Sequence, residues 1–239
     1  MGKNIFLTSI GKKLVMSISG GFLIIFLLLH GTINFFSVLD TINGAWGAPD
    51  GWFQLGCDFM ALPIVDIMVP VLAAGFAIHI LFAMWLEWNN IKSRGALAGR
   101  YAAGSKAKTD SFAAKNMIYL GLIVLLGIAL HLLDFWQHMQ LQEWTGGEAQ
   151  NPYVLLENTF GRWWILLLYI CWFTVLYLHL GHGFWSAFQT LGWNNMVWIK
   201  RLKVIGTIVA ALIWVVFVSV ALNAFLHANG LFGLPSVLG

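Results

Sequence analysis

Charge is scarce in this chain. Only 10% of its 239 residues are Asp, Glu, Lys or Arg, whereas 59% are hydrophobic, and the mean hydropathy is +0.79. Soluble globular domains carry about 25% charged residues. The composition therefore excludes a water-soluble domain and indicates an integral membrane protein.

Cysteine and sequence motifs for soluble chemistry are also missing. The chain has two cysteines, Cys57 in a predicted loop and Cys171 within an apolar segment, and we expect no disulfide between them. Because iron–sulfur clusters and thiolate zinc sites need several clustered cysteines, any iron–sulfur chemistry must belong to another chain. Nucleotide-binding motifs are absent, and no grouping of Ser, His and an acid suggests hydrolysis.

Long hydrophobic runs are what the sequence does contain. A membrane-spanning helix needs roughly 20 mostly apolar residues, whereas barrel strands are about ten residues long and alternate polar with apolar. The first run is too long for a signal peptide and lacks a cleavage pattern, so we expect it to be a mature helix. The sequence predicts an all-α integral membrane protein, a single domain over residues 1–239 with five transmembrane helices in a bundle, at 14–39, 62–88, 115–138, 162–188 and 202–227.

Basic residues are distributed unevenly along the chain. They cluster before the first segment, in the second loop and in the fourth loop, whereas the first loop, the third loop and the C-terminal tail have none and Arg162 stands at the edge of the third. The positive-inside rule then predicts a cytoplasmic N-terminus and a C-terminus on the outer side. The second loop is either a solvated connection or a docking surface for a cytoplasmic partner. The basic residues proposed for docking are Lys106, Lys108, Lys200 and Arg201.

Each of the first four apolar segments carries a histidine in its later half. Buried histidines are costly in a membrane and usually face a bundle interior or a cofactor. The first and third segments run outward, so His30 and His131 are expected at matched depth near the outer side. The second and fourth run inward, which pairs His79 with His179 near the inner side. A single buried histidine is more often structural, but two matched pairs favour two bis-histidine haems.

Glycines near these histidines favour a flat ligand. Gly75, Gly127 and Gly183 each lie four residues from a candidate ligand, and residues four apart share a helix face. His182 competes with His179, but its neighbours one turn away are not glycines, so we favour His179. His138 and His227 end their segments and are interpreted as interfacial.

Two stretches resemble a known family. SISGGFLIIFLLLHGTIN is similar to the first helix, and HLGHGFWSAFQTLG to the fourth helix, of the single-chain, di-haem cytochrome b membrane anchor of succinate dehydrogenase and fumarate reductase. The order of five segments, with one histidine in each of the first four, extends the resemblance over essentially the whole chain.

The resemblance implies a function, cofactors and partners. It implies two haems b, with His30 and His131 as iron ligands of the distal haem and His79 and His179 as those of the proximal one. It further implies electron transport in the respiratory chain, at a bacterial cytoplasmic (inner) membrane. The partners would be a flavoprotein and an iron–sulfur subunit on the cytoplasmic face and menaquinone as the lipid-soluble substrate.

The acidic residues near the expected quinone site depart from the family's pattern. Some family members place glutamates beside the quinone site and the fourth ligand, whereas the first loop here offers only aspartates. Because quinol oxidation releases two protons, a base is needed, and we nominate Asp134, three residues after His131, with Asp66 at similar depth. The alternative is that Asp134 only caps a polar helix end.

Two other functions compete with this one. The cytochrome b of a hydrogenase or formate dehydrogenase also uses intramembrane histidines, but the order of segments and HGFWSAFQTLG disfavour it. A proton or metal transporter would predict histidines converging on one midplane site, in spans broken by Gly or Pro. Here the histidines are predicted to separate into two leaflets.

Overall fold

A computed structural model describes residues 8–94, 112–193 and 195–238, and every regular element among them is helical. Five helices are long and apolar enough to cross a membrane, over Ile10–Ile42, Pro63–Lys92, Met117–His138, Trp163–Thr190 and Met196–Ala228. This confirms the predicted helical class and number of spans. The first and fifth spans are longer than predicted. The arrangement is compatible with a multi-pass membrane protein.

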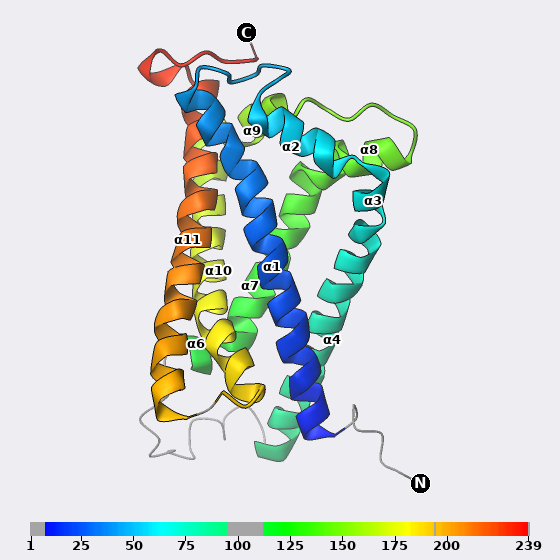
Figure 1. Ribbon diagram of the computed structural model, residues 1–239, viewed down its shortest axis with the longest axis vertical. Coiled ribbons are helices and arrows are strands. Elements are labelled where there is room, and N and C mark those ends of the chain that lie inside the picture. Colours follow the sequence, from blue (N-terminus) through cyan, green and yellow to red (C-terminus); the bar gives the residue numbers. More distant parts are fainter. Residues whose placement is uncertain (1–7, 95–111, 194, 239) are drawn as a thin grey trace. The chain divides into compact units, whose positions relative to one another are not determined.

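Short helices connect the long ones (Figure 1). In chain order, the elements are α1 (Ser9–Ile42), α2 (Trp52–Met60), α3 (Pro63–Asp66), α4 (Met68–Arg94), α6 (Phe112–Lys115), α7 (Met117–Asp134), the 3₁₀ turn η2 (Trp136–His138), α8 (Gln140–Trp144), α9 (Pro152–Phe160), α10 (Trp163–Thr190), α11 (Met196–Ala228) and the 3₁₀ turn η3 (Leu231–Gly233).

Large aliphatic side chains are exposed along the long helices. Ile25, Leu81, Leu126 and Ile208 each expose more than 60% of their surface. In water such surface would be an aggregation or interaction site, whereas lipid tails are as apolar as leucine. The exposed aliphatic surface is therefore what a lipid-facing helix requires.

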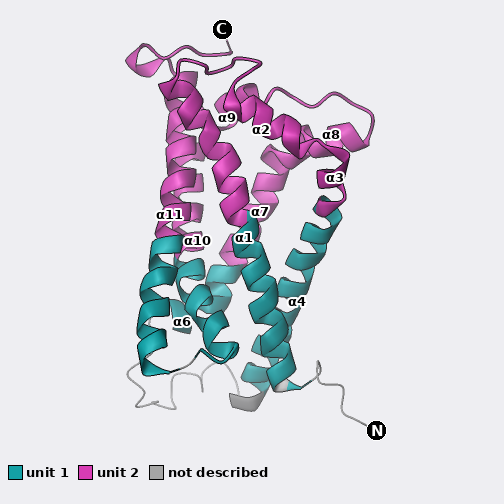
Figure 2. Cartoon of the chain, viewed as in Figure 1, with its two compact units in different colours: residues 1–26, 69–121, 178–209 teal, residues 27–68, 122–177, 210–239 magenta. Residues whose placement is uncertain are grey.

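The chain divides into two compact units (Figure 2). Unit 1 consists of residues 1–26, 69–121 and 178–209, and unit 2 of residues 27–68, 122–177 and 210–239. Twelve of the thirteen basic residues and two of the ten acidic ones belong to the segments of unit 1, which gives a formal charge of +10. The segments of unit 2 have one basic and eight acidic residues, a formal charge of −7.

In unit 2 the start of α2 is held by a carboxylate from α1. The N-cap residue of α2, Gly51, offers no side chain, and the orphan backbone N–H groups of Trp52 and Phe53 instead donate to Asp40, both at 2.8 Å. The hydroxyl of Tyr153 in α9 donates to the same carboxylate at 2.6 Å. Asp40 thus joins α1, α2 and α9.

A second buried carboxylate of unit 2 holds the C-terminal tail. Glu157 in α9 accepts hydrogen bonds from the Trp46 indole at 2.8 Å, the Ser236 hydroxyl at 2.6 Å and the Val237 backbone N–H at 3.0 Å. Gly47 has a φ of +79°, and a Cβ there would overlap the side chain of Val237. Glycine is therefore required where the first loop meets the tail.

Candidate functional site

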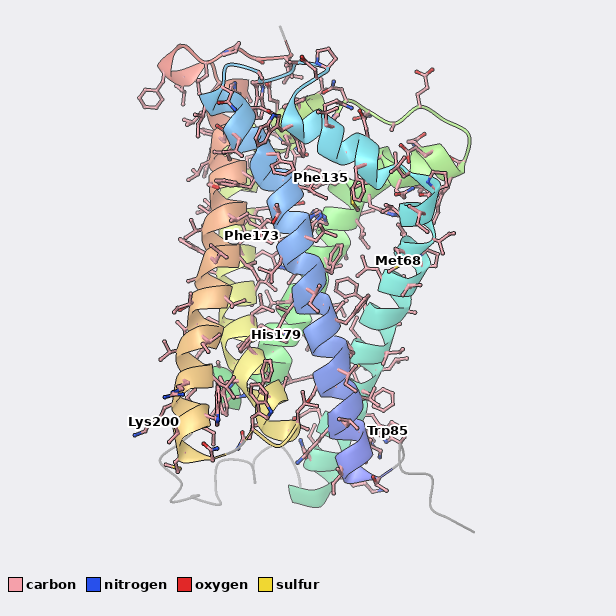
Figure 3. The ribbon with its side chains drawn as sticks, in the orientation of Figure 1. Met68, Trp85, Phe135, Phe173, His179 and Lys200 are labelled. Atoms are coloured by element: carbon pink, nitrogen blue, oxygen red, sulfur yellow. The ribbon has the colours of Figure 1, made fainter. Side chains whose placement is uncertain are left out.

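One histidine pair lies in unit 2. His30 of α1 and His131 of α7 have ring centroids 5.8 Å apart, with planes at 84°. Aromatic rings surround them: Phe217 lies 5.9 Å from His30, and Phe135 and Trp172 lie 5.1 Å and 6.1 Å from His131. Figure 3 labels Phe135 and also Phe173, whose ring lies 5.4 Å from that of Phe217. Three aromatic rings therefore pack beside the pair.

The other pair lies in unit 1. His79 of α4 and His179 of α10 have ring centroids 6.5 Å apart, with planes at 73° (Figure 3 labels His179). The structure pairs His79 with His179 rather than with His182, whose ring instead lies 4.9 Å from that of Trp185. The four predicted histidines are thus brought together in the two predicted combinations.

The spacing within each pair suits one metal ion between two imidazoles. In metal sites the bond from metal to imidazole nitrogen is about 2.0 Å and the nitrogen is about 1.1 Å from the ring centroid, so opposed rings have centroids about 6 Å apart. The observed 5.8 Å and 6.5 Å lie on either side of that value. In the part of the chain described, no three His, Cys, Asp or Glu side chains form a metal-binding group. Each pair thus offers two imidazole nitrogens at a spacing that one metal ion could bridge.

The ring nitrogens differ in their partners. His79 Nδ1 lies 3.1 Å from the Ser19 hydroxyl, and His30 Nε2 lies 3.4 Å from the Asn34 amide. The buried Nδ1 of His179 has no hydrogen-bond partner in the structure. The buried Nδ1 atoms of His138 and His182 are unpaired as well, so this feature is shared with histidines outside the two pairs.

Glycines of neighbouring helices allow close packing at both histidines of the unit 1 pair, which spacing along one helix could not predict. A Cβ on Gly20 would lie 3.3 Å from His79 Cε1, and one on Gly121 would lie 3.6 Å from His179 Cε1. These two glycines belong to neighbouring helices, so their spacing from a histidine on the same helix carries no signal. Each gives an imidazole room beside its backbone.

The three glycines predicted from own-helix spacing contact other side chains. A Cβ on Gly75 would lie 2.7 Å from Phe22 Cε1, one on Gly127 would overlap the Trp172 indole, and one on Gly183 would lie 3.6 Å from Met117 Cε. Gly75 and Gly127 therefore admit aromatic rings from neighbouring helices. A place for these glycines against a flat cofactor stays a prediction.

The two nominated acids are both hydrogen-bonded within unit 2. Asp134 accepts from the Tyr169 hydroxyl at 2.7 Å, and Tyr169 is almost fully buried. Asp66 accepts from the Gln140 amide at 2.6 Å, and the Trp144 indole lies 3.4 Å away. Asp134 thus has a phenol partner on α10, which the sequence did not indicate.

Other polar residues were missed or only partly interpreted. His227, expected at an interface, is 1% exposed; its ring stacks on Trp46 at 3.9 Å, and its nitrogens lie 2.8 Å from Thr41 Oγ1 and 2.6 Å from the Pro235 carbonyl. Burial and the hydrogen bond to Asp40 raise the pKa of Tyr153. Carboxylates in predicted loops look solvated in a sequence, so neither Asp40 nor Glu157 was expected to be buried.

Two of the four proposed docking residues lie in the described part of the chain. Lys106 and Lys108 lie outside the described residues. Lys200 and Arg201 are exposed on α11, and the Arg201 guanidinium lies 5.5 Å from the centre of the Trp198 ring (Figure 3 labels Lys200). These two cations are accessible to a partner.

Comparison of the chain with protein-family models, with curated proteins and with solved structures found no match.

Proposed function

We propose that this chain is the membrane-anchor cytochrome b subunit of a succinate:quinone oxidoreductase of the succinate dehydrogenase and fumarate reductase class. It would pass electrons between a cytoplasmic iron–sulfur subunit and menaquinone. The proposal depends on two histidine pairs, His30 with His131 and His79 with His179. In each pair the two imidazoles come from different apolar helices and are spaced for one metal ion.

Haem, bound at both pairs, would supply reversible one-electron chemistry. His30 and His131 would hold one haem iron, and His79 and His179 the other. The aromatic rings around His30 and His131 would exclude water from that iron. The residues of this chain would thus provide two imidazole ligands for each iron and an apolar surrounding, and ligand identity and surrounding polarity are the protein's means of setting a haem potential.

The quinone would be bound near the first pair. A site that takes electrons singly from a quinol needs a base for the released protons. Asp134 would accept a proton, and its bond from Tyr169 fixes the carboxylate in place. Asp66, which accepts a hydrogen bond from Gln140, is the second candidate base and would pass the proton on to water.

Charge supports the proposed orientation. The segments of unit 1 carry +10, which by the positive-inside rule would place them toward the cytoplasm. The flavoprotein and iron–sulfur partners would dock there, against Lys200, Arg201 and the second loop. The C-terminus would be on the outer side of a bacterial cytoplasmic membrane.

The test is reduction of the purified complex by alternative substrates. A tagged chain, isolated from its native membrane with its partners, should show a b-type absorption spectrum that succinate reduces. Reduction by formate or hydrogen instead would reject the proposal in favour of another dehydrogenase. A colourless protein that carries a bound transition metal would indicate the transporter class.

A further inference from the structure

Ser19 contacts a proposed haem ligand from a neighbouring helix. It lies on α1 in unit 1, is 8% exposed, and its Oγ is 3.1 Å from His79 Nδ1 on α4. Its hydroxyl also donates to the backbone carbonyl of Met16 at 3.2 Å. Sixty residues separate Ser19 from His79, so no local motif connects them.

The two contacts of the Ser19 hydroxyl together determine which ring nitrogen of His79 carries the proton. A serine hydroxyl has one hydrogen and can also accept. If that hydrogen goes to the Met16 carbonyl, which can only accept, the contact with His79 is satisfied when Nδ1–H donates to Ser19 Oγ. This is the only assignment that uses both contacts, and it leaves the lone pair on His79 Nε2.

The neighbouring glycine also makes room for the ring. The next residue on α1, Gly20, lies against the imidazole. A Cβ added to it would lie 3.3 Å from His79 Cε1. Ser19 thus holds one ring nitrogen while Gly20 leaves room for the adjacent carbon. The two consecutive residues thus lie against the imidazole at Nδ1 and at Cε1.

We propose that Ser19 is a positioning residue for His79: its hydroxyl oxygen accepts the Nδ1 proton and so presents Nε2 to a haem iron. This inference rests on the proposed function, because it assumes that a haem occupies the pair. An acceptor on the outer nitrogen raises the basicity of a histidine ligand and fixes its tautomer. A more basic ligand stabilises the more positive, oxidised iron, so Ser19 should lower the reduction potential of that haem.

The effect should be confined to one haem. His179, the other member of the pair, has no partner at Nδ1. At the unit 2 pair, His30 Nε2 faces an amide nitrogen of Asn34, which is a donor rather than an acceptor. Because Ser19 and His79 both belong to unit 1, the expected shift belongs to the haem of that unit.

The experiment is a potentiometric titration of the wild type, Ser19→Ala and Ser19→Thr in the assembled complex. Ser219→Ala is the matched control, because that hydroxyl donates to the Val216 carbonyl of its own helix. Ser19→Ala should raise the midpoint of one component by an amount equal to about a tenfold change in its equilibrium, or about 59 mV for one electron. The other component should not move, and Thr should restore the wild-type value.

Each outcome decides the inference. Loss of one haem in Ser19→Ala with retention in Ser19→Thr would also support it, since the hydroxyl would then hold the ligand. Unchanged potentials in Ser19→Ala, or loss of haem in both variants, would overturn it. A wild-type protein without haem would instead reject the proposed function, so the two failures are distinguishable.

Discussion

The two units differ in the sign of their charge and in how their charged side chains are paired. Unit 2 carries −7 and encloses two carboxylates, Asp40 and Glu157, each satisfied by three neutral donors. Unit 1 carries +10, and several cations lie against indole rings, as Lys12 does at 3.6 Å from the centre of the Trp85 ring. Figure 3 labels Trp85 and also Met68, the last residue of a segment of unit 2.

The difference teaches what each unit is built to do. The buried carboxylates of unit 2 tie the first loop, α9 and the tail together through neutral hydrogen bonds, which hold a fixed arrangement without a buried cation. The exposed cations of unit 1 leave charge available to an outside partner. A matching histidine pair in each unit means that cofactor binding can be tested separately in the two surroundings.

The largest expected effect is loss of one haem while the other remains. His131→Ala should abolish the spectral component of unit 2, and His79→Ala that of unit 1, because an iron left with one axial imidazole is poorly held. Haem content and low-temperature difference spectra of the purified variants measure this. His138→Ala, whose histidine belongs to neither pair, is the control. If His131→Ala and His79→Ala removed the same component, the pairs would be wrongly assigned.

Next in size is loss of quinol oxidation without loss of haem. Asp134→Asn keeps the shape of the side chain and its contact with Tyr169 but removes the base. General-base catalysis is typically worth about 10²- to 10⁴-fold in rate, so turnover should fall at least about 100-fold. Quinol-dependent reduction of the complex is the assay, with Asp66→Asn compared in parallel. Turnover near wild type in both variants would reject the proton route.

A change in stability should separate the buried carboxylates from exposed ones. Glu157→Ala leaves an indole N–H, a hydroxyl and a backbone N–H without their acceptor. Because each unsatisfied buried group costs about 1–3 kcal/mol, we expect a loss of about 3 kcal/mol or more. Thermal unfolding in detergent should show it as a lower Tm. Glu148→Ala, at an exposed position, should leave the Tm unchanged, and an equal effect of both changes would contradict the network.

The smallest expected effect concerns docking. Surface ion pairs are worth about 0.2–1 kcal/mol each, so Lys200→Gln with Arg201→Gln should weaken assembly with the partner subunits only a few-fold. The loss should shrink as salt is added, because salt already screens the wild-type attraction. Co-purification yield across a salt series measures it. Arg162→Gln, which changes the one basic residue of unit 2, should have no effect; if it weakened assembly equally, unit 1 would not be the docking side.

Much of the fold could be predicted from sequence, because each span is a property of its own segment. Length and apolarity are enough to find five helices without knowing their neighbours. The pairing of His30 with His131 also followed from depth alone, since the direction of each helix fixes the height of a residue. Iron binding at these pairs stays a prediction.

What the sequence could not supply depends on the rotation and register of neighbouring helices. Ser19 and Gly20 contact His79 only because α1 turns that face toward α4. Asp40 and Glu157 become buried only when the first loop and the tail fold over them, and a carboxylate next to a loop otherwise looks solvated. The Tyr169 partner of Asp134 likewise lies 35 residues away on another helix.

The most direct test of the central claim is the haem content of the purified wild-type chain. Extraction and quantification of haem against protein should give two haems b per chain, falling to one in His131→Ala. A wild-type protein that is folded and membrane-inserted but carries no haem would contradict the account.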